Sequence, residues 1–324
     1  MVRSADELRK IARKAISDAA ASLRFDANET IFFQRQLEHI EQTIYEIKYP
    51  TLIARDLVPK IGGINTGAEV YTYREYDQVG VAKILSDYAD DLPRADVLAK
   101  ETTSPIKSIG DSYGYSLQEL RAASMANVQL DSTKGSAARR MIEEQIDRLL
   151  SFGSIPHGFR GLLNQTGTST YMIPNGVSGF PQWSKKTSDE ILDDLNGIAK
   201  SVVVASNGVE YIDTIVIPFD QHALISTKPR SSTSDTTVLE FFLKNSPWVK
   251  EVIPWYRCNT AGSGGTPRGV GFRRDPEALG AVIPQEFEQL PVQQDNLAFK
   301  IPCHARCGGV VVRLPLTIVY FDNF

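Results

Sequence analysis

A polar, tyrosine-bearing segment followed by a long helical segment constrains the fold of this chain more than any short motif does. Residues Thr66–Asp91 carry four tyrosines among charges of both signs, and Ala68–Tyr76 alternates like a strand without an apolar face. Gly80 interrupts the alternation, which resumes over Val81–Leu85. A two-stranded ribbon alone is at best marginally stable in water. The pattern therefore predicts a polar ribbon that rests on another surface, most simply on a second copy of the chain.

A helical pattern follows the ribbon over about Ser116–Phe152. It begins with a capping box, Ser116 and Glu119, whose side chains satisfy amides of the first helical turn. A second start lies at Ser132, and Gly153 is a residue type that commonly follows a helix end. The apolar residues of the second part recur on one face and are Ala138, Ile142, Ile146, Leu149 and Leu150. We expect a long helix with one buried face.

The rest of the chain shows shorter helical and strand patterns. Helical spacing marks Ala5–Leu23 and Thr30–Ile47, Thr51–Ile61 is an apolar extended segment, and Gly158–Ser184 has the composition of a loop. Further helices are predicted from the capping box Thr187–Glu190 and at Asp220–Ser226 and Val238–Asn245, and strands at Tyr211–Ile217, Trp248–Trp255, Arg268–Arg273, Leu297–Pro302 and Gly309–Tyr320. This order predicts an α/β lobe followed by C-terminal strands.

Length, charge and cysteine content exclude several classes of protein. At 324 residues, the chain exceeds one ordinary domain. Its formal net charge of −4 provides no basic balance for binding a phosphate backbone. No apolar run is long enough for a helix that spans a membrane. The three cysteines are too few and too odd in number for a disulfide framework, so a reducing compartment is expected.

Cys303-His304-Ala305-Arg306-Cys307 is the strongest metal-like cluster, and Cys258 could supply a third thiolate. Zinc sites use thiolates and imidazoles as ligands, commonly in two closely spaced pairs. Here there is no second pair, and strand alternation would direct His304 away from its neighbours. We therefore expect no metal site at these residues.

The sequence also contains no recognisable catalytic or cofactor motif. Gly262–Gly265 is not followed by Gly-Lys-Ser/Thr, and no Gly-x-Ser-x-Gly occurs. The carboxylates of Asp189, Glu190, Asp193 and Asp194 are placed in the first turns of a predicted helix, where they suit the helix dipole. We expect no enzyme activity and no cofactor.

Four stretches together resemble tailed-bacteriophage major capsid proteins of the Hong Kong 97 type. They are Gly114–Leu120, Gly161–Asn164, Ile283–Pro291, and Cys307–Pro315 with the following Ile318–Phe321. Encapsulin nanocompartment shells share this fold. The resemblance implies an α+β capsid fold with an N-terminal arm, an extended β-ribbon called the E-loop, a peripheral domain with a long spine helix, and an axial α/β domain.

The resemblance also implies domain boundaries. The arm would be Met1–Lys60, the E-loop Ile61–Ala95, the peripheral domain Asp96–Asn164 with Ile283–Phe324, and the axial domain Gln165–Val282. The spine helix would lie near Ser132–Phe152. The E-loop of one copy would then rest on the peripheral domain of the next. The residues expected to make these intersubunit contacts are Arg74, Glu75, Asp77 and Lys83 on the ribbon and Arg139, Arg140, Glu143 and Glu144 on the spine helix.

The function implied is that of a major capsid protein, which self-assembles into the icosahedral head around the phage genome. The expected partners are copies of the chain in hexamers and pentamers, portal, scaffold and decoration proteins, and double-stranded DNA bound without sequence specificity; no membrane partner is expected. Assembly would take place in the host cytoplasm, and the mature protein would be in the virion. An encapsulin-type compartment shell is the first alternative, and an enzyme that uses the α/β lobe is the second.

Overall fold

The computed structural model describes residues 48–84, 94–126, 130–231, 233 and 235–324, together with Lys10, Arg13 and Lys14. The chain divides into two units, Met1–Pro50 and Thr51–Phe324, and the description below concerns the second unit. The helices predicted before residue 48 therefore lie outside the described residues, apart from three helical positions.

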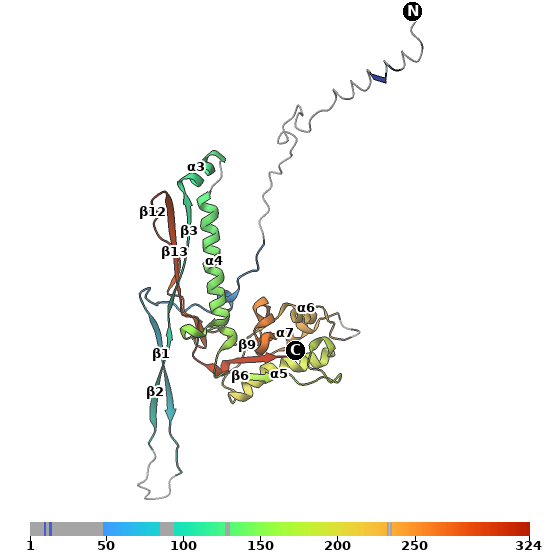
Figure 1. Ribbon diagram of the computed structural model, residues 1–324. Helices are drawn as coiled ribbons and strands as arrows, with labels where there is room; N and C mark the ends of the chain where they lie inside the picture. Colours follow the sequence, from blue (N-terminus) through green and yellow to red (C-terminus); the bar gives the residue numbers. More distant parts are fainter. Residues whose placement is uncertain are drawn as a thin grey trace, which may run out of the picture. The chain divides into compact units, whose positions relative to one another are not determined.

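The polar ribbon is an antiparallel hairpin of β1 (Val70–Val79) and β2 (Asp96–Pro105), which is seen as the long pair of strands in Figure 1. The pairing is continuous from Val70 opposite Pro105 to Val79 opposite Asp96. One expectation is therefore wrong, because residues 81–84 form no strand. The second strand of the ribbon begins at Asp96, directly after the expected E-loop end at Ala95. A ten-residue strand needs a partner of equal length, which the short segment after Gly80 cannot supply.

The predicted helical segment contains α3 (Leu117–Ala126) and α4 (Leu130–Phe152). The predicted apolar stripe of α4 is buried throughout. The helix ends at Phe152 and is followed by Gly153, whose φ of +66° lies in the left-handed region that favours glycine. Gly161 then passes so close to α4 that an added Cβ would lie 2.3 Å from the carbonyl carbon of Ser151. This close passage ties the next segment to the end of the helix.

An antiparallel set of strands lies beside α4. β3 (Lys107–Ser116) pairs along its full length with β13 (Ala298–Cys307), although the two strands are far apart in sequence. β13 also pairs with β11 (Gln285–Gln289) and β12 (Gln293–Asp295). The predicted C-terminal strand at Leu297–Pro302 is confirmed and extends five residues farther, to Cys307.

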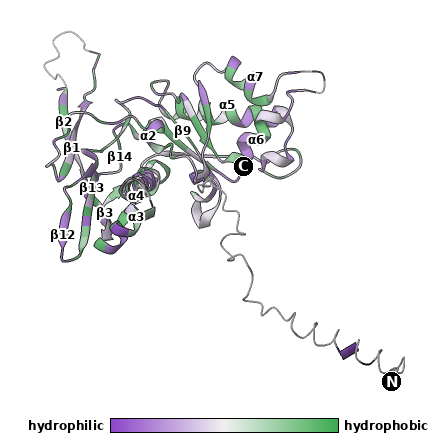
Figure 2. Ribbon diagram, turned by 90° about the horizontal axis from the view of Figure 1, so that it is seen from above, coloured by the Kyte–Doolittle hydropathy of each residue, from purple (hydrophilic) through white to green (hydrophobic). Residues whose placement is uncertain are grey.

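The α/β lobe is built on a five-stranded sheet with the order β6-β15-β9-β7-β8. The strands are β6 (Ser169–Met172), β7 (Thr214–Ile217), β8 (Glu251–Pro254), β9 (Arg268–Phe272) and β15 (Ile318–Asp322). The helices of the lobe are α5 (Ser188–Ala205), α6 (Phe219–Thr227) and α7 (Val238–Asn245), which lie together in Figures 1 and 2. The helix predictions from residue 187 to 245 are therefore confirmed.

Both faces of this sheet are buried, against two different cores. Ile318 and Tyr320 of β15 belong to the core that includes α4, whereas Val319 and Phe321 belong to the core that includes α5 and α7. This alternation follows from the two-residue period of a strand. A sheet buried on both faces has continuous apolar strands rather than alternating ones, which is why Thr214–Ile217 is buried at every position.

Three local predictions differ from the structure. Residues Ala54–Leu57, expected to be extended, form a short helix, α2, whose first amide is bonded to the spine helix. The expected loop Gly158–Ser184 contains β6, which pairs in parallel with β15. The predicted strand Gly309–Tyr320 is two strands, β14 (Val310–Val312) and β15; β15 lies inside the sheet of the α/β lobe, where its even- and odd-numbered residues pack into different cores.

The remaining elements are short. They are β4 (Gly153–Ser154), β5 (Phe159–Arg160), β10 (Leu279–Ala281), β14 (Val310–Val312), and the 3-10 turns Ile155–His157, Leu162–Asn164, Trp183–Lys185, Tyr256–Thr260, Ser263–Gly265 and Pro315–Thr317.

Candidate intersubunit surfaces

The root of the ribbon is attached to the body of the chain through tyrosines. The Tyr73 hydroxyl donates to the carbonyl oxygen of Val312 at 2.9 Å, and Arg313 donates to the Tyr71 hydroxyl at 2.8 Å. Both tyrosine rings pack against a small core that includes Ile106 and Val311. Burial raises the pKa of Tyr73 above its usual value. These contacts fix the direction in which the ribbon leaves the body.

Beyond the root, the ribbon is exposed on both faces. The register places Arg74 and Glu101 on one face and Glu75, Asp77 and Lys100 on the other. Arg74 already has a partner within the ribbon, since its Nε lies 2.7 Å from Glu101 Oε1. Arg74 therefore lies on the opposite face of the ribbon from Glu75 and Asp77.

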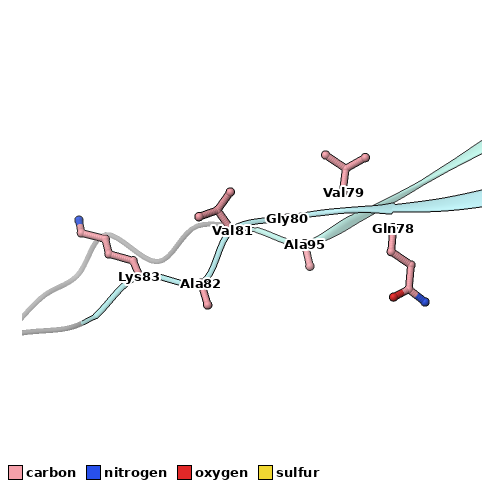
Figure 3. A pocket seen from close by; sticks show the side chains of 7 residues that line it. All are labelled: Gln78, Val79, Gly80, Val81, Ala82, Lys83 and Ala95. Carbon is pink, nitrogen blue, oxygen red and sulfur yellow. The ribbon is translucent and has the colours of Figure 1, made fainter. Parts of the chain in front are cut away.

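The outer part of the ribbon carries apolar as well as charged side chains. Figure 3 shows Val79 and Val81 on one side of the chain, with Gln78 and Ala95 on the other. These residues, with Gly80, Ala82 and Lys83, line an open hollow of about 540 Å³. Val81 and Ile84 are almost fully exposed, at 79% and 98%. Apolar surface of this kind favours contact with a partner.

On the spine helix, the four predicted contact residues have different environments. Glu143 forms an ion pair with Arg55 at 2.9 Å, so part of its charge is used within the chain. The guanidinium of Arg139 lies 5.8 Å from the ring centre of Phe287. Arg140 is half-buried, whereas Glu144 is exposed. Arg139 and Glu144 are therefore the members of the set most open to a neighbour.

The structure reveals a buried polar junction that sequence inspection missed. Asp147 of α4 is 2% exposed; its Oδ1 accepts from the Ala54 amide at 3.0 Å and its Oδ2 from Arg257 Nε at 3.1 Å. Tyr256 is within 3.5 Å of the same carboxylate, which raises the pKa of the tyrosine in addition to the effect of burial. The only available signal was an aspartate next to an apolar stripe, which is common on solvated helix faces.

The cysteine cluster is part of the core. Cys258, Cys303 and Cys307 are free thiols, each buried, and His304 lies on the opposite side of β13 from its cysteine neighbours. Burial raises the pKa of Cys307 to about 11 and that of Cys258 further. In the part of the chain that the structure describes, no group of three or more His, Cys, Asp or Glu side chains is placed to hold a metal ion. Among the same residues, no helix combines the length and apolar character needed to cross a membrane.

Solved structures of viral particles share this fold. The capsid of Myoviridae phage XM1 superposes with a TM-score of 0.80 at 18% identity, covering 91% of this chain and 100% of that one. A structure from Mycobacterium phage Bobi gives 0.60 at 12% identity, with 88% and 94% covered. A virus-like particle from Pyrococcus furiosus gives 0.52 at 14% identity, with 82% and 90% covered. At these identities, the similarity establishes the α+β fold of the Hong Kong 97 type.

Family membership is established by sequence. No curated protein matches the chain. A family model described as major capsid protein matches residues 80–324, which is most of its length. The match includes β2, the spine helix and the whole α/β lobe. The chain therefore belongs to the major capsid protein family: it is a structural subunit that associates with copies of itself in the shell of a virion.

Proposed function

We propose that this subunit forms the icosahedral head of a tailed phage, as hexamers and pentamers that enclose double-stranded DNA. The observation that carries the proposal is the ribbon, whose root is fixed by Tyr71 and Tyr73 while its outer part is exposed on both faces. A standard stable interface buries about 1,600 Å² in total. An extended ribbon that reaches a neighbour supplies such an area without a large globular contact.

The division into arm, E-loop, peripheral domain and axial domain is also part of this proposal. The strand pairing supports an E-loop that ends near Pro105 instead of Ala95. The sheet order supports assigning β15 to the axial domain with β6 and β9. The peripheral domain would then consist of β3, α3, α4, β11, β12 and β13.

Among the predicted contact residues, we propose that Glu75, Asp77 and Lys83 meet the neighbouring copy directly. Arg139 and Glu144 are the corresponding residues on the spine helix, while Arg74, Arg140 and Glu143 support these surfaces from within the chain. Each exposed ion pair contributes about 0–1 kcal/mol. Shell stability would therefore arise from many weak contacts repeated by symmetry.

We further propose that the chain has no catalytic activity and that it assembles in the host cytoplasm with portal and scaffold proteins. The net charge of −4 fits a wall that encloses DNA without binding it by sequence or strongly by charge.

Replacing residues 74–101 by a short glycine-rich turn tests the role of the ribbon. This change preserves the root pairs from Val70–Pro105 to Tyr73–Thr102. We expect a folded chain, with a circular dichroism spectrum and melting transition close to those of the wild type, that forms no particles in negative-stain micrographs. Particles at the wild-type yield would rule out the ribbon as an essential contact, and a wild-type chain that never assembles would rule out the shell function.

An encapsulin-type compartment is the second candidate, because a virus-like particle from Pyrococcus furiosus also has this fold, so the fold is not limited to phage heads. The two functions differ in the contents of the particle. Nuclease-protected double-stranded DNA in particles purified from infected cells supports the phage head, and a co-purifying protein cargo without nucleic acid supports the compartment.

A further inference from the structure

We propose that neighbouring α/β lobes are joined by an apolar knob that inserts into an apolar groove of the next copy. The knob is the turn that carries Val177 and Phe180, before α5, and the groove is lined by Val209, Leu314 and Leu316. The inference rests on the proposed shell function and names the surfaces through which neighbouring copies of the chain would join into a ring. It concerns parts of the chain other than the ribbon.

The knob is an exposed apolar turn with a fixed backbone. Val177 is 96% exposed, although its amide donates to Glu190 Oε1 at 2.6 Å. The turn is closed by the Gly176 amide, which donates to the Phe180 carbonyl oxygen at 3.0 Å. Lys185 Nζ lies 3.6 Å from the centre of the Phe180 ring. An apolar side chain on a fixed turn binds with little loss of conformational entropy.

A buried ion pair holds this turn against the lobe. Lys186 Nζ lies 2.6 Å from Asp194 Oδ2 on α5, and both side chains are almost inaccessible to solvent. The same ammonium group donates to the Pro174 carbonyl oxygen at 2.7 Å, which fixes the segment that enters the turn. Trp183 donates to the same Asp194 oxygen at 3.0 Å. Breaking a buried pair by removing one partner is costly, so the knob is firmly positioned.

The groove has a volume of about 270 Å³ and mainly apolar walls. Val209 is 73% exposed and Leu316 is 45% exposed. Its polar groups are already bonded: Ser206 Oγ accepts from the Glu210 amide at 2.9 Å, and the Glu210 carboxylate pairs with Arg273 at 2.5 Å. An apolar side chain that enters the groove would therefore leave no unpaired charge buried.

The separation of the two surfaces excludes contact between them within one copy, so in a shell built of copies of this chain we assign the knob of a neighbouring copy to the groove. The knob is bonded to the first turn of α5, and the groove begins directly after its last turn. The 18 residues of α5 separate them by about 27 Å, at 1.5 Å per residue. One copy therefore cannot place its own knob in its own groove. Two complementary but different patches on one subunit make a head-to-tail contact, which closes into a ring when the rotation permits.

Engineered cysteines test this contact in the full chain. In the double variant Val177→Cys, Leu316→Cys, oxidation of assembled particles is expected to give a disulfide-linked ladder of dimers and higher multimers on a non-reducing gel. The natural cysteines are buried, so they provide little background. Each single variant, and the pair Val177→Cys with Leu297→Cys, which places the second thiol on an exposed residue of the β12–β13 turn, should give no ladder.

Well-formed particles of the double variant that give no ladder, or only a bond within one chain, would overturn the inference while leaving the shell function intact. A second pair of variants covers the case in which the cysteines prevent assembly. Val177→Asp should fold like the wild type, because the side chain is exposed, but should weaken each contact about tenfold or more, equivalent to about 1.4 kcal/mol. Val177→Leu should assemble normally. Wild-type particle yields for Val177→Asp would also overturn the inference.

Discussion

Asp147 of the spine helix and Arg257 of the α/β lobe form an ion pair across 3.1 Å, and the carboxylate is 2% exposed. The same carboxylate accepts the first amide of α2. Three segments that are distant in sequence therefore depend on one side chain.

Replacing Asp147 with alanine should destabilise the folded chain by about 3 kcal/mol, because it leaves Arg257 partly buried without its partner. Asp147→Asn should cost less, since the amide oxygen still accepts from Ala54. Denaturant unfolding of the three proteins measures the difference. Arg148→Ala, on the exposed side of the same helix, is the matched control and should change the unfolding free energy by less than about 0.5 kcal/mol. An alanine variant as stable as the control would show that the junction is unimportant.

Lys186→Met should also destabilise the chain by about 3 kcal/mol, because Asp194 stays buried without a countercharge. Adding Asp194→Asn removes the orphaned charge and keeps an acceptor for Trp183. We expect the double variant to recover more than half of the lost unfolding free energy. A double-mutant cycle from denaturant unfolding gives the coupling, and additive losses would contradict a direct interaction.

Arg74 and Glu101 can be exchanged to separate contact within the ribbon from contact with a neighbour. Arg74→Glu alone places two like charges opposite each other and should reduce particle yield modestly, because an exposed pair is worth about 0–1 kcal/mol. The swap Arg74→Glu with Glu101→Arg should restore the yield. If the swap assembles no better than the single variant, Arg74 acts on a neighbouring copy instead.

Glu190 should make folding stability depend on pH. The Val177 and Thr187 amides lower the pKa of this carboxyl below its usual value. A lowered native-state pKa means that the stabilisation is complete above about pH 4.3, the ordinary glutamate value, and is lost as pH falls through the native value. The wild type should therefore unfold at higher denaturant concentration than Glu190→Gln at pH 7, with the two converging in acid. A constant difference across this range would exclude the carboxylate as the cause.

The cysteine thiols should be unreactive in the native protein. All three are buried, and burial raises the pKa of Cys307 to about 11, which leaves very little thiolate at neutral pH. Labelling with a disulfide reagent should proceed no faster than unfolding of the chain and should reach three thiols only in denaturant. Rapid labelling of one native thiol would show an opening of the core around β13.

The sequence was sufficient to predict helix starts and buried helix faces, because these depend on interactions between residues that are close in the chain. The capping boxes at Ser116 and Thr187 start α3 and α5 as predicted, and the helix Val238–Asn245 has the predicted bounds. Apolar spacing identified the buried face of α4. Capping and periodicity depend on residues within a few positions of each other, so one sequence is enough to read them. The order of these elements also supported the resemblance to phage capsid proteins.

The tertiary structure alone decided the long-range pairings and the environments of the charged residues. β1 pairs with β2, and β15 enters the sheet of the α/β lobe, because strand partners are chosen by surfaces far away in the chain. Likewise, Asp147 and Lys186 look like ordinary surface charges until their partners are known. The sequence by itself determined the helices, their buried faces and the family, whereas packing determined which polar groups are inside and which apolar groups remain exposed for a neighbouring copy.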